Sequence, residues 1–286
     1  METLGKYLVS AESLLSETSA YLLFDLRSGE AGFAAFQNEH LAEAQHLNLE
    51  WDLADKPSDP AIGGRHPLPD LHRFAELLGK MGITPETVVV IYDDKQGANA
   101  AARFWWMLQA VGHQQVYLID GGYQAAITAG YPTSDQLTTI QAQAPYPVKD
   151  WSGQTIAIDA VAEGLSTGTI RVIDVRDAAR YRGETEPIDA VAGHIPGAVN
   201  LPLTENVDKN GCFFMKDQLL EKYEPLIQNR DPSSIVIHCG SGVTACHSLF
   251  SLANAGLTGM KLYVGSWSEW SRSGRERATG ANPIQS

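Results

Sequence analysis

The sequence predicts an α/β protein made of two tandem domains, each with a mostly parallel sheet and helices on both faces. Two observations support this fold class. Short apolar strands alternate with amphipathic helical stretches in each half of the chain. A strand that ends in Asp-x-Arg occurs at residues 22–27 and recurs at 171–176, which is about half a chain length later. Other motifs recur in the same order, and such a repeat indicates a duplicated domain.

The elements can be followed along each half. Helical spacing of apolar residues ends at a glycine or polar residue, and short apolar runs lie between the helices. The first half is expected to contain helices at 70–81 and 99–111 and strands at 22–27, 88–92 and 116–119. The second half is expected to contain strands at 171–176 and 235–237 and helices at 216–228 and 245–255.

A polar stretch separates the two halves. Residues 133–153 contain Pro145 and Pro147 and show no clear period, which is typical of a linker. We therefore predict a first domain at 1–134, a linker at 135–153 and a second domain at 154–286.

Length and composition exclude several classes of function. The 286 residues are 44% hydrophobic, which is enough for two cores. A net charge of −13 argues against nucleic acid or an anionic membrane surface as the main partner. Three cysteines make no disulfide framework, and no apolar run approaches ~18 residues. The first residues do not have the pattern typical of a signal peptide, so none is expected there. We expect a soluble cytoplasmic protein, without a metal or nucleotide cofactor because no such motif occurs.

The candidate nucleophile is Cys239. It follows a short buried strand and precedes a loop of small residues that leads into a helix: Gly240, Ser241, Gly242, Val243 and Thr244. Backbone N–H groups that point into such a loop, with a helix N-terminus behind them, favour an anion. A thiolate at this position is expected to be nucleophilic near neutrality. The two glycines allow the tight turn, and the two hydroxyl groups can add donors.

The first half carries a copy of this loop that lacks the cysteine. Asp93 stands where Cys239 stands in the second half, and residues 93–99 include two carboxylates but no thiol. One copy therefore keeps the nucleophile, which suggests either an active site shared between the domains or a first domain that only supports the second.

A cysteine phosphatase is one alternative. Such enzymes carry arginine at the sixth position after the cysteine, where this chain has Ala245. The loop contains no cation, so a phosphate ester would find no bidentate partner there. This alternative ranks third.

The loop at 239–245, Cys-Gly-Ser-Gly-Val-Thr-Ala, resembles the active-site loop of the tandem-domain rhodanese superfamily, and most closely that of its mercaptopyruvate sulfurtransferases. The resemblance covers nearly the whole chain and extends to residues 105–107, 174–176, 180–183, 193–200 and 265–270. It implies that Cys239 takes a sulfane sulfur from a small donor as a persulfide. An acceptor thiol, such as a thioredoxin-like protein, or cyanide would then remove it.

The resemblance also implies residues that bind the donor. Arg180 matches the family arginine that binds the donor's carboxylate or sulfonate. A second arginine is not obvious after Glu186, although Arg182 is a possible substitute and Arg65 can either contact the donor or stabilise its own loop. The family's acidic residue and histidine, which form a proton relay to the loop serine, correspond to Glu50 and His66. A histidine suits the protonation of an enolate leaving group.

The choice of donor stays open. Loops of thiosulfate rhodaneses carry cations where this chain has Gly240 and Ser241, which favours 3-mercaptopyruvate here, whereas the missing second arginine favours thiosulfate. A different class of function is a sulfur carrier or interaction module that does not turn over.

Two further features are expected to be structural. Asp174 and Arg176 recur as Asp25 and Arg27 in the half that lacks the nucleophile, so we expect them to form structural ion pairs. Cys246 is expected to be a small buried residue, with redox pairing to Cys239 as the alternative.

Overall fold

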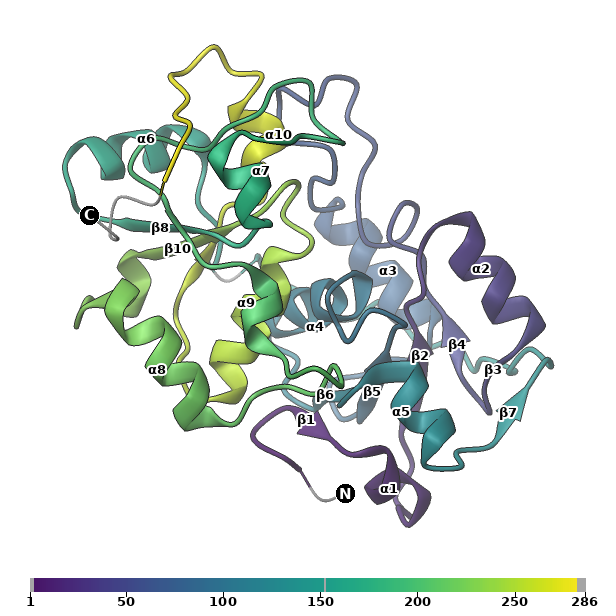
Figure 1. Ribbon diagram of the computed structural model, residues 1–286. Helices are drawn as coiled ribbons and strands as arrows, with labels where there is room; N and C mark the ends of the chain where they lie inside the picture. The colour runs from purple at the N-terminus through teal and green to yellow at the C-terminus, as the bar shows by residue number, and fades with distance from the viewer. Residues whose placement is uncertain (1–2, 152, 282–286) are drawn as a thin grey trace. The chain divides into compact units, whose positions relative to one another are not determined.

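The computed structural model describes residues 3–151 and 153–281, and Figure 1 shows their helices and strands. The chain forms two compact units. The first comprises residues 3–55, 68–151 and 208–213, and the second comprises 56–67, 153–207 and 214–281. Each unit thus includes a short segment from the other half of the chain, which the predicted division at a single linker did not anticipate.

The first unit is built on a five-stranded parallel sheet. Its strands, in spatial order, are β1 (Leu8–Val9), β6 (Val116–Ile119), β5 (Val89–Tyr92), β2 (Leu22–Asp25) and β4 (Gln45–His46). The helices are α1 (Ala11–Leu15), α2 (Gly29–Asn38), α3 (Leu71–Lys80), α4 (Ala100–Ala110) and α5 (Gly122–Thr128). A separate antiparallel pair joins β3 (His40–Leu41) to β7 (Thr133–Ser134).

The second unit repeats this plan with a four-stranded parallel sheet. Its strands, in spatial order, are β11 (Lys261–Leu262), β10 (Ile235–His238), β8 (Arg171–Asp174) and β9 (Val199–Asn200). The helices are α6 (Ile158–Ser166), α7 (Ala178–Arg182), α8 (Lys216–Ile227), α9 (Ala245–Asn254) and α10 (Ser266–Trp270), with 3₁₀ turns η1 (Leu203–Asn206) and η2 (Pro232–Ser234).

The strand orders confirm the predicted duplication. The series β6-β5-β2-β4 in the first unit corresponds to β11-β10-β8-β9 in the second. In both, the aspartate of the Asp-x-Arg motif ends its strand and accepts a 2.6 Å bond from the motif's arginine, between Arg27 and Asp25 and between Arg176 and Asp174. Each arginine also donates to the carbonyl that precedes a buried histidine, at Glu39 and Gly193. The predicted structural ion pairs are therefore present in both copies.

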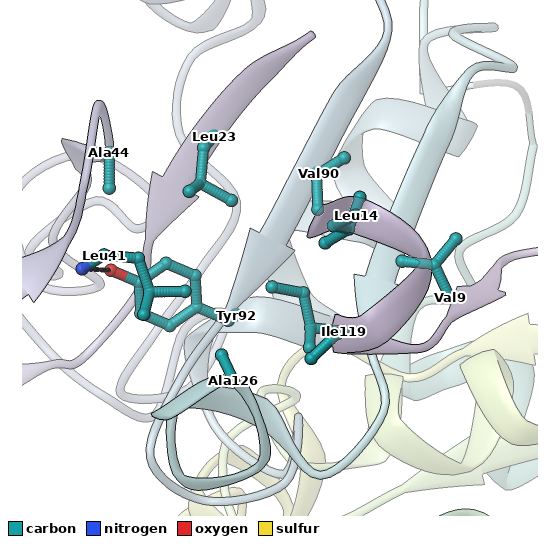
Figure 2. Packing of buried hydrophobic residues seen from close by; sticks show 10 residues of the cluster. Val9, Leu14, Leu23, Leu41, Ala44, Val90, Tyr92, Ile119 and Ala126 are labelled. Carbon is teal, nitrogen blue, oxygen red and sulfur yellow. Dashed lines mark hydrogen bonds between the residues drawn. The ribbon is translucent and has the colours of Figure 1, made fainter. Parts of the chain in front are cut away.

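The core of each unit forms where strands meet helices. Figure 2 shows the first unit, where apolar side chains of β1, β2, β5 and β6 contact Leu14 of α1 and Ala126 of α5. The Tyr92 hydroxyl accepts the Leu41 N–H at 3.1 Å within this cluster, so its polar atom is satisfied. In the second unit, Val172 and Val236 pack with Trp267 of α10.

The stretch predicted as a linker packs on the first unit. The N–H of Gln143 donates to the Gly79 carbonyl at 2.7 Å, and the N–H of Tyr146 donates to Ala75 at 2.9 Å. These bonds hold residues 143–146 against α3. Over the two described ranges, no helix has the length and apolar character that crossing a membrane would require.

Candidate active site

Cys239 lies at the carboxyl end of β10, which pairs with β8 on one side and β11 on the other. Its residue surface is only 1% exposed. The loop that follows reaches α9 at Ala245, with Val243 buried and Thr244 in the position that caps this helix. Parallel sheets bind their ligands at this edge, beyond the carboxyl ends of the strands.

Backbone bonds to α10 orient the loop. The N–H of Trp267 donates to the Cys239 carbonyl at 3.0 Å, and that of Ser268 donates to the Gly240 carbonyl at 2.8 Å. In a trans peptide the C=O and the next N–H point in opposite directions. The N–H groups of Gly240 and Ser241 therefore point away from α10, as an inward-facing anion site requires.

The two loop glycines have different reasons to be glycine. Gly242 has φ +71°, and a Cβ there would lie 2.4 Å from the Val264 carbonyl oxygen. Gly240 instead leaves room for cations, because a Cβ there would lie 3.2 Å from Nη2 of Arg65 and 3.7 Å from Nη2 of Arg180. The positive charge that the loop itself lacks is thus supplied by guanidinium groups from elsewhere in the second unit.

The sister loop in the first unit shows what this geometry binds. Oδ1 of Asp93 accepts the N–H groups of Lys95 and Gly97, both at 2.8 Å, and Oδ2 accepts those of Asn99 and Ala101, both at 3.3 Å. Asp93 is fully buried, and this burial raises its pKa although the four N–H groups favour the charged form. The backbone N–H groups of the loop after β5 therefore converge on the loop's own carboxyl group.

His66 reaches the second unit on the segment 56–67. The N–H of Gly63 donates to Oε1 of Glu269 at 2.8 Å, and the N–H of Arg65 donates to Oγ of Ser268 at 3.1 Å. These bonds hold the segment on α10. Nδ1 of His66 then lies 2.8 Å from Oγ of Ser241, which is the pair that the sequence predicted.

Glu50, the other predicted member of this relay, belongs to the first unit. It is exposed, and its backbone N–H donates to Oδ1 of Asn48 at 2.8 Å. His66 is the predicted relay residue that belongs to the same unit as Ser241.

Arginines and buried carboxylates form a cluster next to the loop. Oδ1 of Asp189 accepts Nη1 of Arg65 and, at 2.8 Å, Nη1 of Arg272. Oε1 of Glu186 accepts Nη2 of Arg180 at 2.6 Å. The side chains of Asp189 and Glu186 are 0% and 3% exposed, so these two carboxylates are shielded from water while their arginine partners are partly exposed. The sequence analysis did not assign Glu186, Asp189 or Arg272, and the one local signal was two carboxylates soon after Arg180.

Arg182 has a different environment. Its Nε donates to Oε1 of Glu184 at 2.6 Å, and its side chain is 40% exposed. Two residues apart on α7, Arg180 and Arg182 project in nearly opposite directions, since each residue turns the helix by about 100°. Of the three predicted donor-binding arginines, the structure brings Arg65 and Arg180 to the loop.

His238 does not have the geometry of a base for the thiol. Its ring is buried, Nδ1 lies 3.1 Å from the Cys239 carbonyl oxygen, and Nε2 lies 3.6 Å from Oδ2 of Asp174. Burial lowers the pKa of His238 despite the neighbouring carboxylate, so the ring is neutral at pH 7.

The other two cysteines differ from Cys239. Sγ of Cys246 lies 3.4 Å from the Gly242 carbonyl oxygen and is buried in α9. Cys212 belongs to the first unit, where burial raises its thiol pKa to about 11. No disulfide joins any two of these three residues, all of which the structure describes. Among the described residues no group of three or more His, Cys, Asp or Glu is placed to hold a metal ion.

Comparison with known proteins places this site in a family. Residues 10–129 and 157–273 each match the Rhodanese-like domain. The chain is 39% identical to a Pseudomonas aeruginosa protein named "Probable 3-mercaptopyruvate sulfurtransferase", over 92% of this chain and 94% of that protein. It is 34% identical to the human 3-mercaptopyruvate sulfurtransferase (82% of this chain, 78% of that one) and 29% identical to the chicken thiosulfate sulfurtransferase (82% and 79%).

Solved structures agree with the sequence matches. The 3-mercaptopyruvate sulfurtransferase from Leishmania major superposes with a TM-score of 0.81 at 29% identity, covering 94% of this chain and 75% of that one. SseA from Escherichia coli, described as one of the 3-mercaptopyruvate sulfotransferases, gives 0.76 at 26% identity, covering 92% and 99%. With a rhodanese-like domain in each half and a cysteine loop at the carboxyl end of β10, this chain belongs to the rhodanese-like sulfurtransferase family.

Proposed function

We propose that the chain transfers sulfur from 3-mercaptopyruvate, through a persulfide on Cys239, to a thiol or cyanide acceptor. The observation that carries this choice of donor is the 2.8 Å approach of His66 Nδ1 to Ser241 Oγ within the cysteine loop. Removal of sulfur from 3-mercaptopyruvate leaves an enolate that needs a proton, whereas removal of sulfur from thiosulfate leaves sulfite, which needs none. A histidine–serine pair beside the nucleophile therefore suits the first donor better.

In the first step the Cys239 thiolate attacks the donor's sulfur. The S–S bond forms, the C–S bond breaks, and the electron pair of the C–S bond goes to the donor's carbon. The proton of the donor thiol passes to that carbon through Ser241 and His66, which gives pyruvate and a persulfide anion. The inward N–H groups of the loop stabilise this anion as those of the sister loop stabilise the Asp93 carboxylate.

In the second step an acceptor thiolate attacks the outer sulfur of the persulfide. A new S–S bond forms, the bond to Cys239 breaks, and the thiolate of Cys239 is restored. Cyanide would take the same sulfur as thiocyanate. We propose a small thiol or a thioredoxin-like protein as acceptor and a reducing compartment such as the cytoplasm, because Cys239 must stay unoxidised between turnovers.

The donor's carboxylate is bound, in this proposal, by Arg180 together with Arg65. Both guanidinium groups adjoin Gly240, and a planar guanidinium binds a carboxylate with two parallel hydrogen bonds. Glu50 would complete the relay to His66, which remains a proposal from the family resemblance.

Thiosulfate is the second candidate donor, because the same two guanidinium groups supply cations that its sulfonate group can use. The relatives' names include both donors. A carrier without turnover and a phosphatase rank below both.

Intact mass of the reduced protein after brief exposure to each donor tests the proposal. We expect the mass to rise by one sulfur atom with 3-mercaptopyruvate and the gain to be absent from Cys239→Ser. Cys212→Ser is the matched control and should gain sulfur as the wild type does, since the high pKa of Cys212 keeps its thiol protonated. A gain of sulfur from thiosulfate alone would identify thiosulfate as the donor in place of 3-mercaptopyruvate. A gain from neither donor would refute the proposal that the chain is a sulfurtransferase for these donors.

A further inference from the structure

We propose that Asp189 makes the site prefer donors with a single negative charge, because its carboxylate offsets part of the arginine charge around Gly240. This inference rests on the proposed function, since it concerns the donor that Cys239 attacks. Asp189 lies in the loop between α7 and β9 of the second unit.

The geometry surrounds one buried carboxylate with three guanidinium groups. Arg65 and Arg272 both donate to Oδ1 of Asp189, and Nη2 of Arg180 lies 3.8 Å from Oδ2. The backbone N–H of Asp189 in turn donates to Oε1 of Glu186 at 3.1 Å. Asp189 thus contacts both of the arginines that adjoin Gly240.

The charges of this cluster nearly balance. Arg65, Arg180 and Arg272 contribute three positive charges, and Asp189 and Glu186 contribute two negative ones. Arg176 also contacts Glu186, but its own charge is matched by Asp174 at 2.6 Å. The Cys239 thiolate is held separately, by the N–H groups of its loop, so this cluster keeps one net positive charge, which matches the single carboxylate of 3-mercaptopyruvate. Thiosulfate, a dianion, would leave one negative charge unbalanced next to the two buried carboxylates.

One oxygen of Asp189 indicates more than a structural role. Oδ2 is buried and, among the described residues, makes no hydrogen bond. Buried oxygens with a purely structural role are usually hydrogen-bonded. This oxygen instead faces Arg180 at ion-pair distance, where it reduces the positive potential of the donor-binding guanidinium.

Asp189→Asn tests the inference because it removes the charge and keeps the shape. We expect the ratio of kcat/KM for 3-mercaptopyruvate to kcat/KM for thiosulfate to fall about tenfold or more, mainly through a lower KM for thiosulfate. This fall in the ratio should be larger at low ionic strength, where salt screens the charge of the donor less. Glu184→Gln is the matched control, since it removes an exposed carboxylate from the same loop, and it should leave the ratio unchanged.

Arg272→Gln provides a second test, in which the ratio of the two kcat/KM values should change in the opposite direction. It removes a positive charge while Asp189 stays charged, so the ratio should rise in favour of 3-mercaptopyruvate. It also keeps the inference testable if Asp189→Asn does not fold.

Equal losses with both donors in Asp189→Asn, or a fall of the ratio in Arg272→Gln, would overturn the inference and leave Asp189 a structural role only. A wild-type protein that gains sulfur from neither donor would instead refute the proposed function. The two failures are therefore distinguishable.

Discussion

The N–H of Gly97 donates to Oδ1 of Asp93 at 2.8 Å, at the end of the strand that corresponds to the one before Cys239. The duplicated domains therefore have equivalent loops after β5 and β10. The first, here called the closed loop, is filled by the carboxyl group of Asp93, and the second carries the thiol of Cys239. The closed loop shows within the same chain that the N–H groups of this backbone turn converge on carboxylate oxygens.

Asp93→Ala should lower the free energy of unfolding by about 3 kcal/mol, because four N–H groups lose their acceptor and those of Gly97 and Ala101 are buried. Urea unfolding followed by circular dichroism measures this loss. Asp94→Ala is the control, since Asp94 is exposed in the same loop and should change stability by less than about 0.5 kcal/mol. Equal effects of the two substitutions would show that the Asp93 carboxylate does not hold the loop.

Gly242→Ala should destabilise the protein by about 2–4 kcal/mol and abolish persulfide formation. The alanine would be strained at φ +71°, and its Cβ would lie 2.4 Å from the Val264 carbonyl oxygen, which would force the loop to shift. Gly112→Ala separates these two causes, because Gly112 has φ +89° but no atom within 4 Å of its Cβ. We expect Gly112→Ala to cost about 1 kcal/mol and to leave persulfide formation intact. The measurements are urea unfolding and intact mass.

Stability at acid pH should depend on Asp174. Burial opposes its ionisation, but Arg176 outweighs this effect and holds the Asp174 pKa below its ordinary value of 3.8. Its stabilising contribution is therefore fully present above the unfolded-state pKa and is lost as pH falls through the lower pKa of the folded state. Asp174→Asn should lose about 3 kcal/mol at neutral pH, because the buried Arg176 loses its 2.6 Å ion pair and keeps the longer one to Glu186 at 3.4 Å.

Urea unfolding at about pH 3 and pH 6 checks this pH dependence. The difference between wild type and Asp174→Asn should shrink at the lower pH. Asp159→Asn, whose side chain is 87% exposed, is the control for general acid effects. A difference that stays constant with pH would contradict the assigned role of Asp174.

The features that the sequence predicted correctly depend on local patterns. The helix expected at 70–81 is observed at Leu71–Lys80, and the strand expected at 116–119 is observed at Val116–Ile119. Apolar spacing and glycines at helix ends determine such elements within a few residues of chain. The cysteine loop was equally visible, because its glycines, nucleophile and following helix are consecutive.

Long-range contacts could not be predicted in the same way. Arg65 and Asp189 are 124 residues apart in the chain, and neither has a pattern that points to the other. The segment 56–67 joins the second unit through bonds to α10, such as Gly63 to Glu269, that only the folded chain reveals. For the same reason the sequence named Arg182 as the possible second arginine and left the role of Arg65 open, whereas the structure brings Arg65 next to Gly240.

His66→Gln should separate the two candidate donors. Glutamine can keep a hydrogen bond to Ser241 but cannot deliver a proton near neutrality, so kcat with 3-mercaptopyruvate should fall about 10²–10³-fold. The thiosulfate reaction has no enolate to protonate and should fall by less than about tenfold. His72→Gln, which changes an exposed histidine of α3, is the control and should leave both reactions unchanged. Steady-state rates with each donor and a common thiol acceptor provide the measurement. Equal losses with both donors would mean that His66 only positions Ser241, and the proton for the enolate would then have to come from another group.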